Sequence, residues 1–552
     1  MTLRRKLSQE DQAQAQKHEA LEQTAHQMRE KVDRFRRDFD VQRLRRRLPL
    51  RFPSRRETPL TFRAQSWYTY AGWEALVDPV ELEHLSTFYV AILLIDFSPL
   101  RAELVDLSKI HLNARGQTPF DPVSLFLCCL LRWDKGLGWQ SLEDLLAGPE
   151  GVCWRMLFGF EKGCTPSASA MRGFYKRLDK AFKLDLCPRF IALLHQVNLL
   201  LERADSSFTS TPLGLPVAGD GMLHEAHSTM LCGQVTDTCY APLSPSHSRP
   251  CPAQDKGFDG CTCTEEMCLE RCCLTTPRDP LARLIHYTGS NHAGEEVAGR
   301  ARNVYGYRSY TQVIRDDELH TYWVAYTSLH PANSDERTIM PEDFAHLRHR
   351  LPDLPIGEFV ADAAAGYADC LHPLYDDHVI PVIAIRHDQG DQDPDRCKIR
   401  GYDAKGYPLC AHGYRMSFNG LDYQRLRACW VCRQVCAQAP HPNPHDADCP
   451  YRDPDRPLGM TRHIRRAFEH PDGSQHERLA RLFPYDSPLW KEHYGPRKNA
   501  VEGRNSQIAR LGLKRMWSYG LEGAIADITF ADLLINLRTL GRLVKQATLL
   551  AG

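Results

Sequence analysis

The sequence predicts an α/β fold in which helices flank a mixed sheet, with a helical N-terminal domain before it and Cys-rich insertions within it. Between residues 119 and 205, apolar residues recur at the three- and four-residue spacing of amphipathic helices. After residue 206 the pattern becomes three strands, helix, strand, helix, strand. That succession predicts a mixed sheet covered by helices.

Composition excludes several classes of protein. The chain has 552 residues, of which 43% are hydrophobic and 25% charged, as in ordinary globular proteins. The longest apolar run, "FYVAILLI" at 88 to 95, is shorter than the roughly 18 to 20 residues that span a bilayer. The N-terminus has no apolar segment typical of a secretory signal. We therefore expect no membrane segment and a cytoplasmic location.

Charge is balanced overall but not along the chain. The 69 basic and 69 acidic residues cancel, whereas residues 1 to 60 hold 16 Lys and Arg against 9 Asp and Glu. Two interpretations of this segment stay open. It is a solvated helix or a flexible arm, or it is an arm that contacts phosphates.

Residues 61 to 205 are predicted to form the helical domain. The segments "DPVSLFLCCLLRW" and "SLEDLLAG" have helical periodicity. Thr165 and Pro166 then predict a helix start, with Thr as the cap and Pro at the first helical position, followed by "SASAMRGFYKRLDKAF". Basic residues concentrate on these last helices, which favours a DNA-binding role for this domain.

Residues 206 to 552 are predicted to contain the sheet. "LPVAGDGML" is a buried strand with Asp220 near its end, and "NVYGYRSYTQVIRDD" and "LHTYWVAYTSLH" form a meander. The segment "GEFVADAAAGY" is a further strand, which ends at Asp362. Near the C-terminus, residues 498 to 515 predict a helix that carries Glu502.

Asp220, Asp362 and Glu502 are candidate metal ligands. Ligand chemistry gathers at the carboxyl ends of strands in open sheets, and both aspartates lie at predicted strand ends. Three converging carboxylates repel one another unless cations lie between them, and their hard oxygens suit Mg²⁺. Two such ions about 3.5 to 4 Å apart serve phosphodiester chemistry. Taken singly, each aspartate could instead cap a turn and the glutamate could be solvated.

The sequence resembles the DDE transposases of bacterial insertion sequences, whose catalytic domain has the RNase H-like fold. The resemblance covers most of residues 119 to 545. "VAGDGMLHEAHS" is similar to the strand with the first Asp, and "FVADAAAGYADCLHPLYDDHVIPVIAIR" to the strand with the second. "YGPRKNAVEGRNSQIARLGLKRMWSYGLEGA" is similar to the helix that bears the Glu.

This resemblance implies Asp220, Asp362 and Glu502 as a triad that binds Mg²⁺ or Mn²⁺. It also implies DNA as partner, a homodimer on DNA, and a bacterial cytoplasm in which the bound protein is associated with the nucleoid. The expected DNA contacts are Tyr494, Arg497, Lys498, Arg504, Arg510, Lys514 and Arg515. The spacing departs from the Tyr, Arg, Glu, Lys signature of many relatives, because four residues instead of three separate Arg497 from Glu502.

Two Cys-rich insertions, at 232 to 273 and 388 to 480, interrupt the catalytic pattern. In the second, Cys429, Cys432, Cys436 and Cys449 form a possible tetrahedral Zn²⁺ set, with Cys410 as a substitute. In the first, the spacing is irregular and the adjacent Cys272 and Cys273 cannot easily both serve one site. The alternative for each insertion is a flexible segment with free thiols.

The sequence therefore predicts a transposase that binds the DNA ends of its element, cleaves phosphodiester bonds and joins the released 3′-hydroxyl ends to target DNA. Two alternatives stay open. One is a DNA-binding protein derived from a transposase and without catalysis, and the other is a metal-dependent nuclease that cuts without joining.

Overall fold

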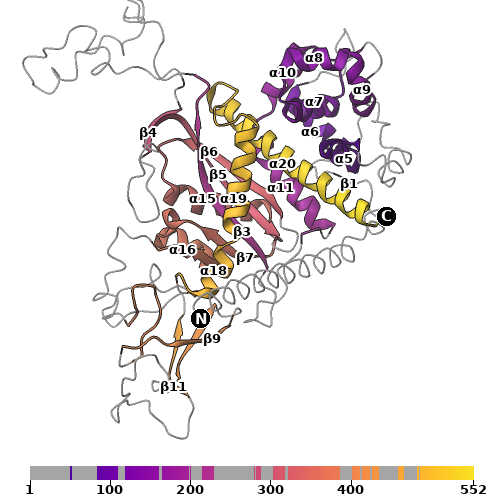
Figure 1. The fold of residues 1–552 in the computed structure, drawn as a ribbon. Helices are drawn as coiled ribbons and strands as arrows, with labels where there is room; N and C mark the ends of the chain where they lie inside the picture. The colour runs from indigo at the N-terminus through magenta and orange to yellow at the C-terminus, as the bar shows by residue number, and fades with distance from the viewer. Residues whose placement is uncertain are drawn as a thin grey trace, which may run out of the picture.

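The protein is described from a computed structural model (Figure 1). Helices pack around one main sheet, and the structure describes sixteen parts of the chain. These are residues 50–51, 84–109, 119–160, 164–197, 199–200, 214–228, 279, 281–287, 302–316, 321–385, 401–410, 413–422, 426–433, 458–464, 482–483 and 485–551. The first Cys-rich insertion, 232 to 273, lies outside these residues, as does the predicted basic arm apart from Leu50 and Arg51.

The main sheet has six strands, in the order β4-β5-β3-β7-β8, with β6 also paired to β5. β5 is antiparallel to β3, β4 and β6, whereas β3, β7 and β8 run parallel to one another. The predicted mixed sheet flanked by helices is thus confirmed. The strands are β3 (Leu215–Glu225), β4 (Arg283–Tyr287), β5 (Arg302–Asp316), β6 (Thr321–Pro331), β7 (Ile356–Ala361) and β8 (Ile380–Ile383).

Burial explains why these segments form strands. All six residues of β7 and all four of β8 are buried, as expected for parallel strands covered on both faces. β6 is buried along most of its length as well. The meander of β3, β5 and β6 follows the prediction, but β4 was not predicted.

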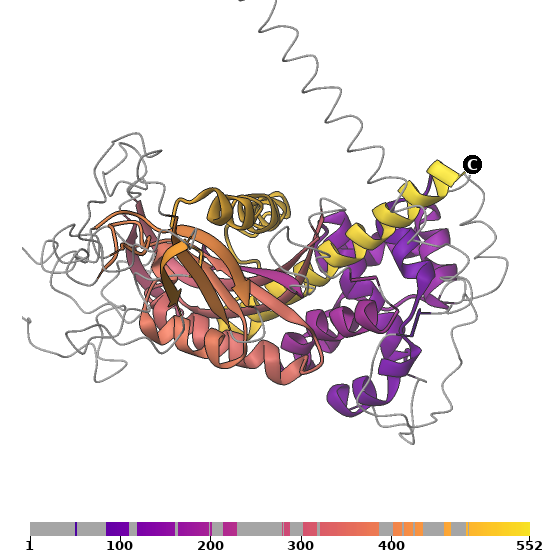
Figure 2. The same ribbon diagram turned by 90° about the horizontal axis from the view of Figure 1, so that it is seen from below.

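Helices cover both faces of the sheet. In Figure 2, α15 (Glu336–Arg350) and α19 (Arg497–Arg510) lie on opposite sides of it. The chain crosses from β7 to β8 through α16 (Ala368–Asp376) and reaches α19 through α18 (Pro488–Tyr494). The helix predicted before the strand that ends at Asp362 and the helix predicted around Glu502 are therefore confirmed as elements.

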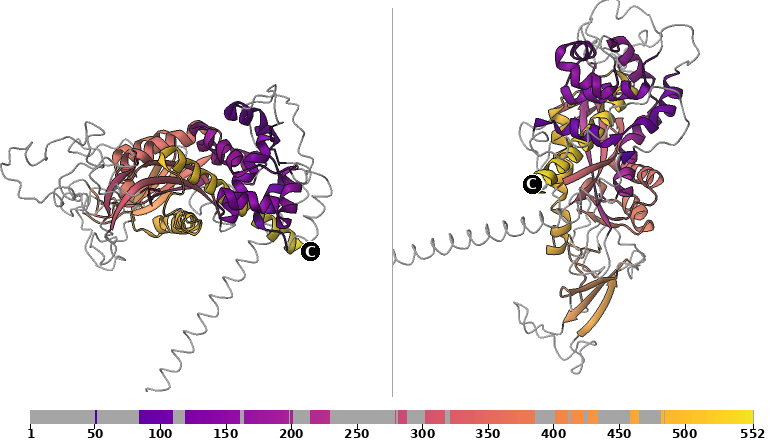
Figure 3. Two further views of the ribbon diagram at one scale, coloured as in Figure 1. Left: turned by 90° about the horizontal axis from the view of Figure 1, so that it is seen from above. Right: turned by 90° about the vertical axis from the view of Figure 1, so that its right-hand side faces the viewer.

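Further helices lie at one end of the sheet (Figure 3). α11 (Lys180–Gln196) and the long α20 (Gly520–Ala551) both pack on β6. α20 continues to α5 and α7, so it connects the sheet to the preceding helices. Those helices are α5 (Thr87–Leu94), α6 (Arg101–Ser108), α7 (Pro122–Lys135), α8 (Trp139–Ala147), α9 (Val152–Phe158) and α10 (Ala168–Arg177). None of the described helices is both long and apolar enough to span a membrane.

The predicted helix start at Thr165 is wrong by two residues. Ser167 is the cap of α10, because its side chain accepts a hydrogen bond from the Ala170 amide at 3.3 Å. The predicted helix also divides in two. Asp179 accepts a bond from the Phe182 amide at 2.7 Å and so begins α11 separately.

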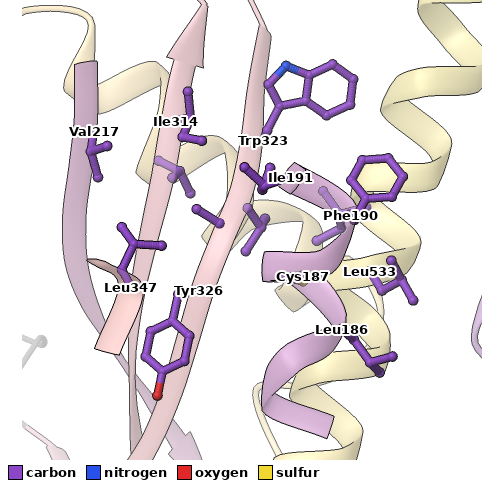
Figure 4. Packing of buried hydrophobic residues seen from close by; sticks show 14 of the residues in the cluster. Leu186, Cys187, Phe190, Ile191, Val217, Ile314, Trp323, Tyr326, Leu347 and Leu533 are labelled. Atoms are coloured by element: carbon purple, nitrogen blue, oxygen red, sulfur yellow. The ribbon is translucent and has the colours of Figure 1, made fainter. Parts of the chain in front are cut away.

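A buried apolar cluster joins the sheet to α11 and α20 (Figure 4). Trp323 of β6 lies beside Phe190 of α11, with ring centroids 6.0 Å apart, and Ile314 of β5 belongs to the same cluster. Leu533 of α20 belongs to the same cluster. Asn536 of α20 also pairs with the backbone of Val324 through two 2.8 Å hydrogen bonds. These contacts fix the sheet that positions the candidate site.

A second, three-stranded sheet lies within the second Cys-rich insertion, below the main sheet in Figure 1. It consists of β9 (Ser417–Asp422), β10 (Arg427–Arg433) and β11 (Leu458–Ile464), all antiparallel. Trp430 of β10 is buried, and the ring of Phe418 packs edge-on against it at 5.2 Å. This part of the insertion is therefore ordered sheet, which the sequence did not predict. A separate two-residue pair joins β1 (Leu50–Arg51) to β2 (Ile95–Asp96).

Candidate active site

The two aspartates lie on adjacent parallel strands. β3 pairs with β7 in a register that places Ala218 opposite Val360. Asp220 and Asp362 each follow that pair by two residues, so both lie beyond the last paired residues at the same edge of the sheet. One strand pairing thus brings together two aspartates that are 142 residues apart in the sequence.

The sequence predicted that Asp220 lies at the end of its strand, and this prediction is wrong. β3 continues for five more residues to Glu225 and stays paired with β5 over that length. Its pairing with β7, however, ends at Ala218. Asp220 is therefore just beyond the point where β3 leaves its parallel neighbour.

Asp362 ends β7 and begins the short turn η4 (Ala363–Ala365). Its carboxylate accepts a hydrogen bond from the Ala364 amide at 2.9 Å. The capping role that sequence analysis left open is therefore present. The Ala364 amide contacts one of the two carboxylate oxygens of Asp362. The side chain is half-buried, and its charge raises the pKa of Glu336.

Glu336 is an acidic residue of this region that sequence reasoning missed. It lies in the first turn of α15, pairs with Arg308 of β5, and approaches β3 at Gly221. A Cβ at Gly221 would lie 2.3 Å from Glu336 Oε1, so the carboxylate occupies space that only glycine leaves open. Because successive residues of a strand face opposite sides, Glu336 approaches from the face opposite Asp220.

Burial and like charge change the protonation of Glu336. Burial first, and then the nearby Asp362, raise the pKa of Glu336 to about 7. Arg308 opposes this rise, and Asp220 adds to it. The sequence gives one relevant signal, an acid in the first turn of the helix before β7. That signal is ambiguous, because acids favour helix N-termini in general.

Tyr310 of β5 pairs with Gly221 and lies on the face of the sheet that Glu336 approaches. Its hydroxyl is buried and has no hydrogen-bond partner among the described residues. Burial raises the pKa of Tyr310 well above its usual value, and the charges of Glu336, Asp362 and Asp220 raise it further. Gly219 makes room for this hydroxyl, since a Cβ there would lie 2.5 Å from it. The charges of all three acids thus act on the same buried hydroxyl, from the two faces of the sheet.

α19 carries Glu502 past this region. Asn505 donates a hydrogen bond from its side-chain amide to Asp220 Oδ2 at 3.3 Å. Glu502 precedes Asn505 by one helical turn, on the same face, and is exposed. The structure therefore brings the helix of Glu502 to Asp220 through Asn505, not through the glutamate itself.

The donor chemistry suits a hard divalent cation. Within the described ranges, no group of three or more His, Cys, Asp or Glu side chains is arranged to hold a metal ion. Mg²⁺ is commonly bound by one or two carboxylates, with water and substrate phosphate completing its coordination. Asp220 and Asp362 fit that two-ligand arrangement.

A buried ion pair anchors α19. Arg504 donates to both oxygens of Asp532 on α20, at 2.9 and 2.8 Å, and both side chains are fully buried. The sequence predicted Arg504 as a DNA contact. Its guanidinium instead binds α19 to α20 in the interior, so we assign it a structural role.

The C-terminal end of α19 is also attached to the sheet. His224 of β3 lies between the Leu513 carbonyl, 2.6 Å from Nδ1, and Ser309 Oγ, 2.8 Å from Nε2. Burial lowers the pKa of His224 to about 3, so the ring is neutral at pH 7. Glu225 exchanges backbone hydrogen bonds with Lys514 and Met516 at 2.8 Å. These bonds fix the turn that follows α19.

The other predicted DNA contacts have varied environments. Arg510, Lys514 and Arg515 are exposed at the end of α19 and in the turn after it. Arg515 donates to the His227 carbonyl at 3.0 Å. Tyr494 is half-buried and stacks on Trp490, with ring centroids 4.0 Å apart. The side chains of Arg497 and Lys498 lie outside the described part of the structure.

The predicted zinc ligands are only partly described. Cys429 and Cys432 lie on β10 and are half-buried, and Cys410 is buried nearby in the chain. Cys436 and Cys449 lie outside the described residues. In a regular strand, two residues three positions apart face opposite sides, but β10 has register shifts against both of its neighbours. Zinc binding stays a prediction.

Comparisons with protein-family models, with curated proteins and with solved structures returned no match for this chain.

Proposed function

We propose that this protein is a DDE transposase with an RNase H-like catalytic domain, in which Asp220, Asp362 and Glu502 are the acidic triad. The observation that carries the proposal is the β3–β7 register, which brings Asp220 and Asp362 together across 142 residues of sequence. The succession of β3 to β6, then α15, β7, α16 and β8, which contains the predicted order with β4 added, supports the fold.

The acidic residues would hold Mg²⁺ or Mn²⁺ against the phosphodiester. Such ions activate the attacking oxygen and stabilise the leaving oxygen. Asp220 and Asp362 supply two carboxylates from adjacent strands, and Asn505 orients the first of them through its amide. Glu502 is exposed one turn before Asn505, where a side chain is free to turn toward DNA-bound reactants.

Exposed cations on the same helix support DNA as the partner. Arg510, Lys514 and Arg515 follow Glu502 within 13 residues and are in contact with solvent. Such residues neutralise phosphates and position the duplex without reading its sequence. Since two ends of an element are cut and joined together, we propose a homodimer on DNA as the active unit.

The test is excision and integration of a marked element built with the DNA that naturally flanks the gene. Wild type, Glu502→Gln and the control Glu342→Gln, which alters an exposed glutamate of α15, are compared in Mg²⁺. We expect activity in wild type and the control and its loss in Glu502→Gln.

Other results have distinct meanings. Equal activity in all three proteins would remove Glu502 from the triad. Cleavage without joining would indicate a nuclease. DNA binding with neither reaction, in every variant, would indicate a transposase-derived binding protein and would overturn the proposal.

A further inference from the structure

A groove separates α8 from α10, far along the chain from the acidic residues. It encloses about 620 Å³. Its lining includes two cations, two polar side chains, an aromatic ring and a glycine. These are Arg172, Lys176, Gln140, Ser169, Trp139 and Gly173. No acidic residue is part of its described lining. Glu143 and Asp144 lie beside it, where Gln140 donates to both carboxylates and the Ala168 amide donates to Glu143 at 2.7 Å. The positive charge of the groove is therefore confined to Arg172 and Lys176 on α10.

The cations extend from one face of α10. Arg172 and Lys176 are four residues apart and both exposed, whereas Met171, Phe174 and Tyr175 form the buried face of the helix. Among the described residues, neither cation has an acidic partner within ion-pair distance. Both charges are therefore available to a ligand.

The wall of the groove is held by stacked side chains. The Trp139 ring lies edge-on to Tyr175 at 5.3 Å and covers the guanidinium of Arg132 at 4.5 Å. Arg132 is buried, and its guanidinium also lies 5.1 Å from the ring of Trp517, in the turn after α19. The groove is thus joined, through Arg132, to the turn that carries Lys514 and Arg515.

Gly173 keeps the groove open. It lies between the two cations in sequence and lines the groove. A Cβ built there meets one atom within 4 Å, Arg177 Nη1 at 3.3 Å, which is the end of a flexible side chain. A larger side chain would therefore fit the helix but would occupy the groove.

We infer that this groove binds the phosphate backbone of duplex DNA, with Arg172 and Lys176 each contacting a phosphate. Residues four apart on a helix are separated by about 6 Å along its axis. Long side chains at that spacing can reach neighbouring phosphates of one strand, which carry one charge per about 3.4 Å of axis. The inference rests on the proposed function, since DNA is the substrate of that function.

Salt dependence of binding tests the two contacts. Each neutralised phosphate contributes about 0.9 to the slope of log K against log salt concentration. For Arg172→Gln with Lys176→Gln, we expect the slope to fall by about 1.8 on duplex DNA carrying the native flanking sequence. The control, Lys109→Gln with Lys180→Gln, removes the same charge from exposed sites outside the groove and should leave the slope unchanged.

A second variant separates the groove from its charge. Gly173→Leu keeps both cations and replaces glycine with a residue of higher helix propensity, so folding should be preserved. We expect weakened duplex binding with an unchanged or higher melting temperature. Binding equal to wild type in Gly173→Leu, or a slope equal to the control in the double variant, would overturn the inference.

The outcomes also separate this inference from the proposed function. Loss of duplex binding in the groove variants, with no metal-dependent cleavage by wild type, would support the groove and contradict the transposase. Cleavage by wild type with normal binding by the groove variants would do the reverse. Equal binding of duplex DNA and a single-stranded RNA of the same length would overturn the choice of duplex DNA.

Discussion

The acidic region and the basic surface of this protein differ in more than charge. Asp220, Asp362 and Glu336 are partly or largely buried, and the first two raise the pKa of Glu336, whose counter-charge is Arg308. Arg172, Lys176, Arg510 and Lys514 are exposed. Burying like charges together costs folding free energy, whereas solvated cations cost little.

This difference indicates separate roles. A fold keeps mutually repelling acids where a ligand offsets the repulsion, as active sites commonly do. The basic residues contribute nothing comparable to folding, so their effect should appear in binding alone. Neutralising the acidic region should therefore change stability, and neutralising the basic surface should not.

The largest effect is expected for a cation that belongs to neither region. Arg504→Leu leaves Asp532 buried without its partner, and we expect a loss of about 3 to 5 kcal/mol in the free energy of unfolding. Urea denaturation measures it. A loss below about 1 kcal/mol would show that Arg504 is not the anchor of α19.

A matched double variant tests the cause. Arg504→Met with Asp532→Leu removes both charges and keeps apolar volume, so most of the lost stability should return. Arg510→Leu, six residues further on and exposed, should change stability by less than about 0.5 kcal/mol.

A smaller effect is expected for Glu336. Its pKa is about 7 in the folded chain against an ordinary value of 4.5, so the folded state binds more protons between these pH values. The contribution of Glu336 to the free energy of unfolding is therefore greatest below pH 4.5, and it falls as the pH rises toward 7. The loss is at most on the order of 3 kcal/mol.

Glu336→Gln cannot titrate and should remove this loss. Without divalent ions, the variant should gain stability over wild type as pH is raised from 5 to 7.5, by urea denaturation. Glu342→Gln, on the exposed face of the same helix, should follow wild type at every pH. Parallel profiles for wild type and Glu336→Gln would contradict the repulsion between the acids.

The smallest effect on folding is expected for the exposed basic residues at the end of α19 and in the turn after it. Arg510→Gln with Lys514→Gln should leave the free energy of unfolding within about 0.5 kcal/mol of wild type. DNA binding should lose about 0.9 in salt slope for each phosphate contact removed. A destabilised protein, or an unchanged slope, would remove the contrast between the two regions.

Sequence patterns predicted the strands that carry the aspartates and the helix that carries Glu502, because β3 and β7 contain short apolar runs and α19 has a helical pattern. They could not predict that β3 continues past Asp220, since this depends on its pairing with β5 and not on its own residues. The strands β9 to β11 were also missed. They form through tertiary pairing in a segment rich in loop-forming residues.

The candidate site was predicted in part for the same reason. Asp220 and Asp362 follow from local strand patterns, and their proximity follows from one parallel pairing. Glu336 depends on the space that Gly221 leaves on the other face of the sheet, and the buried position of Arg504 depends on Asp532 of α20. The spacing of residues along the chain does not predict either of these contacts.

The most direct test of the central claim is cleavage of the native flanking DNA in Mg²⁺ by Asp362→Asn. Asn can still cap η4 at this position, so the fold should be kept. The control is Asp369→Asn, which alters an exposed aspartate paired with Arg337.

If Asp362 supplies a metal-binding carboxylate, its variant should bind DNA as wild type does and cleave it more than about 100-fold more slowly. Losses of 10- to 100-fold already follow from changes to residues that merely orient metal ligands. Asp369→Asn should cleave normally. Cleavage by Asp362→Asn at the wild-type rate would contradict the proposed active site.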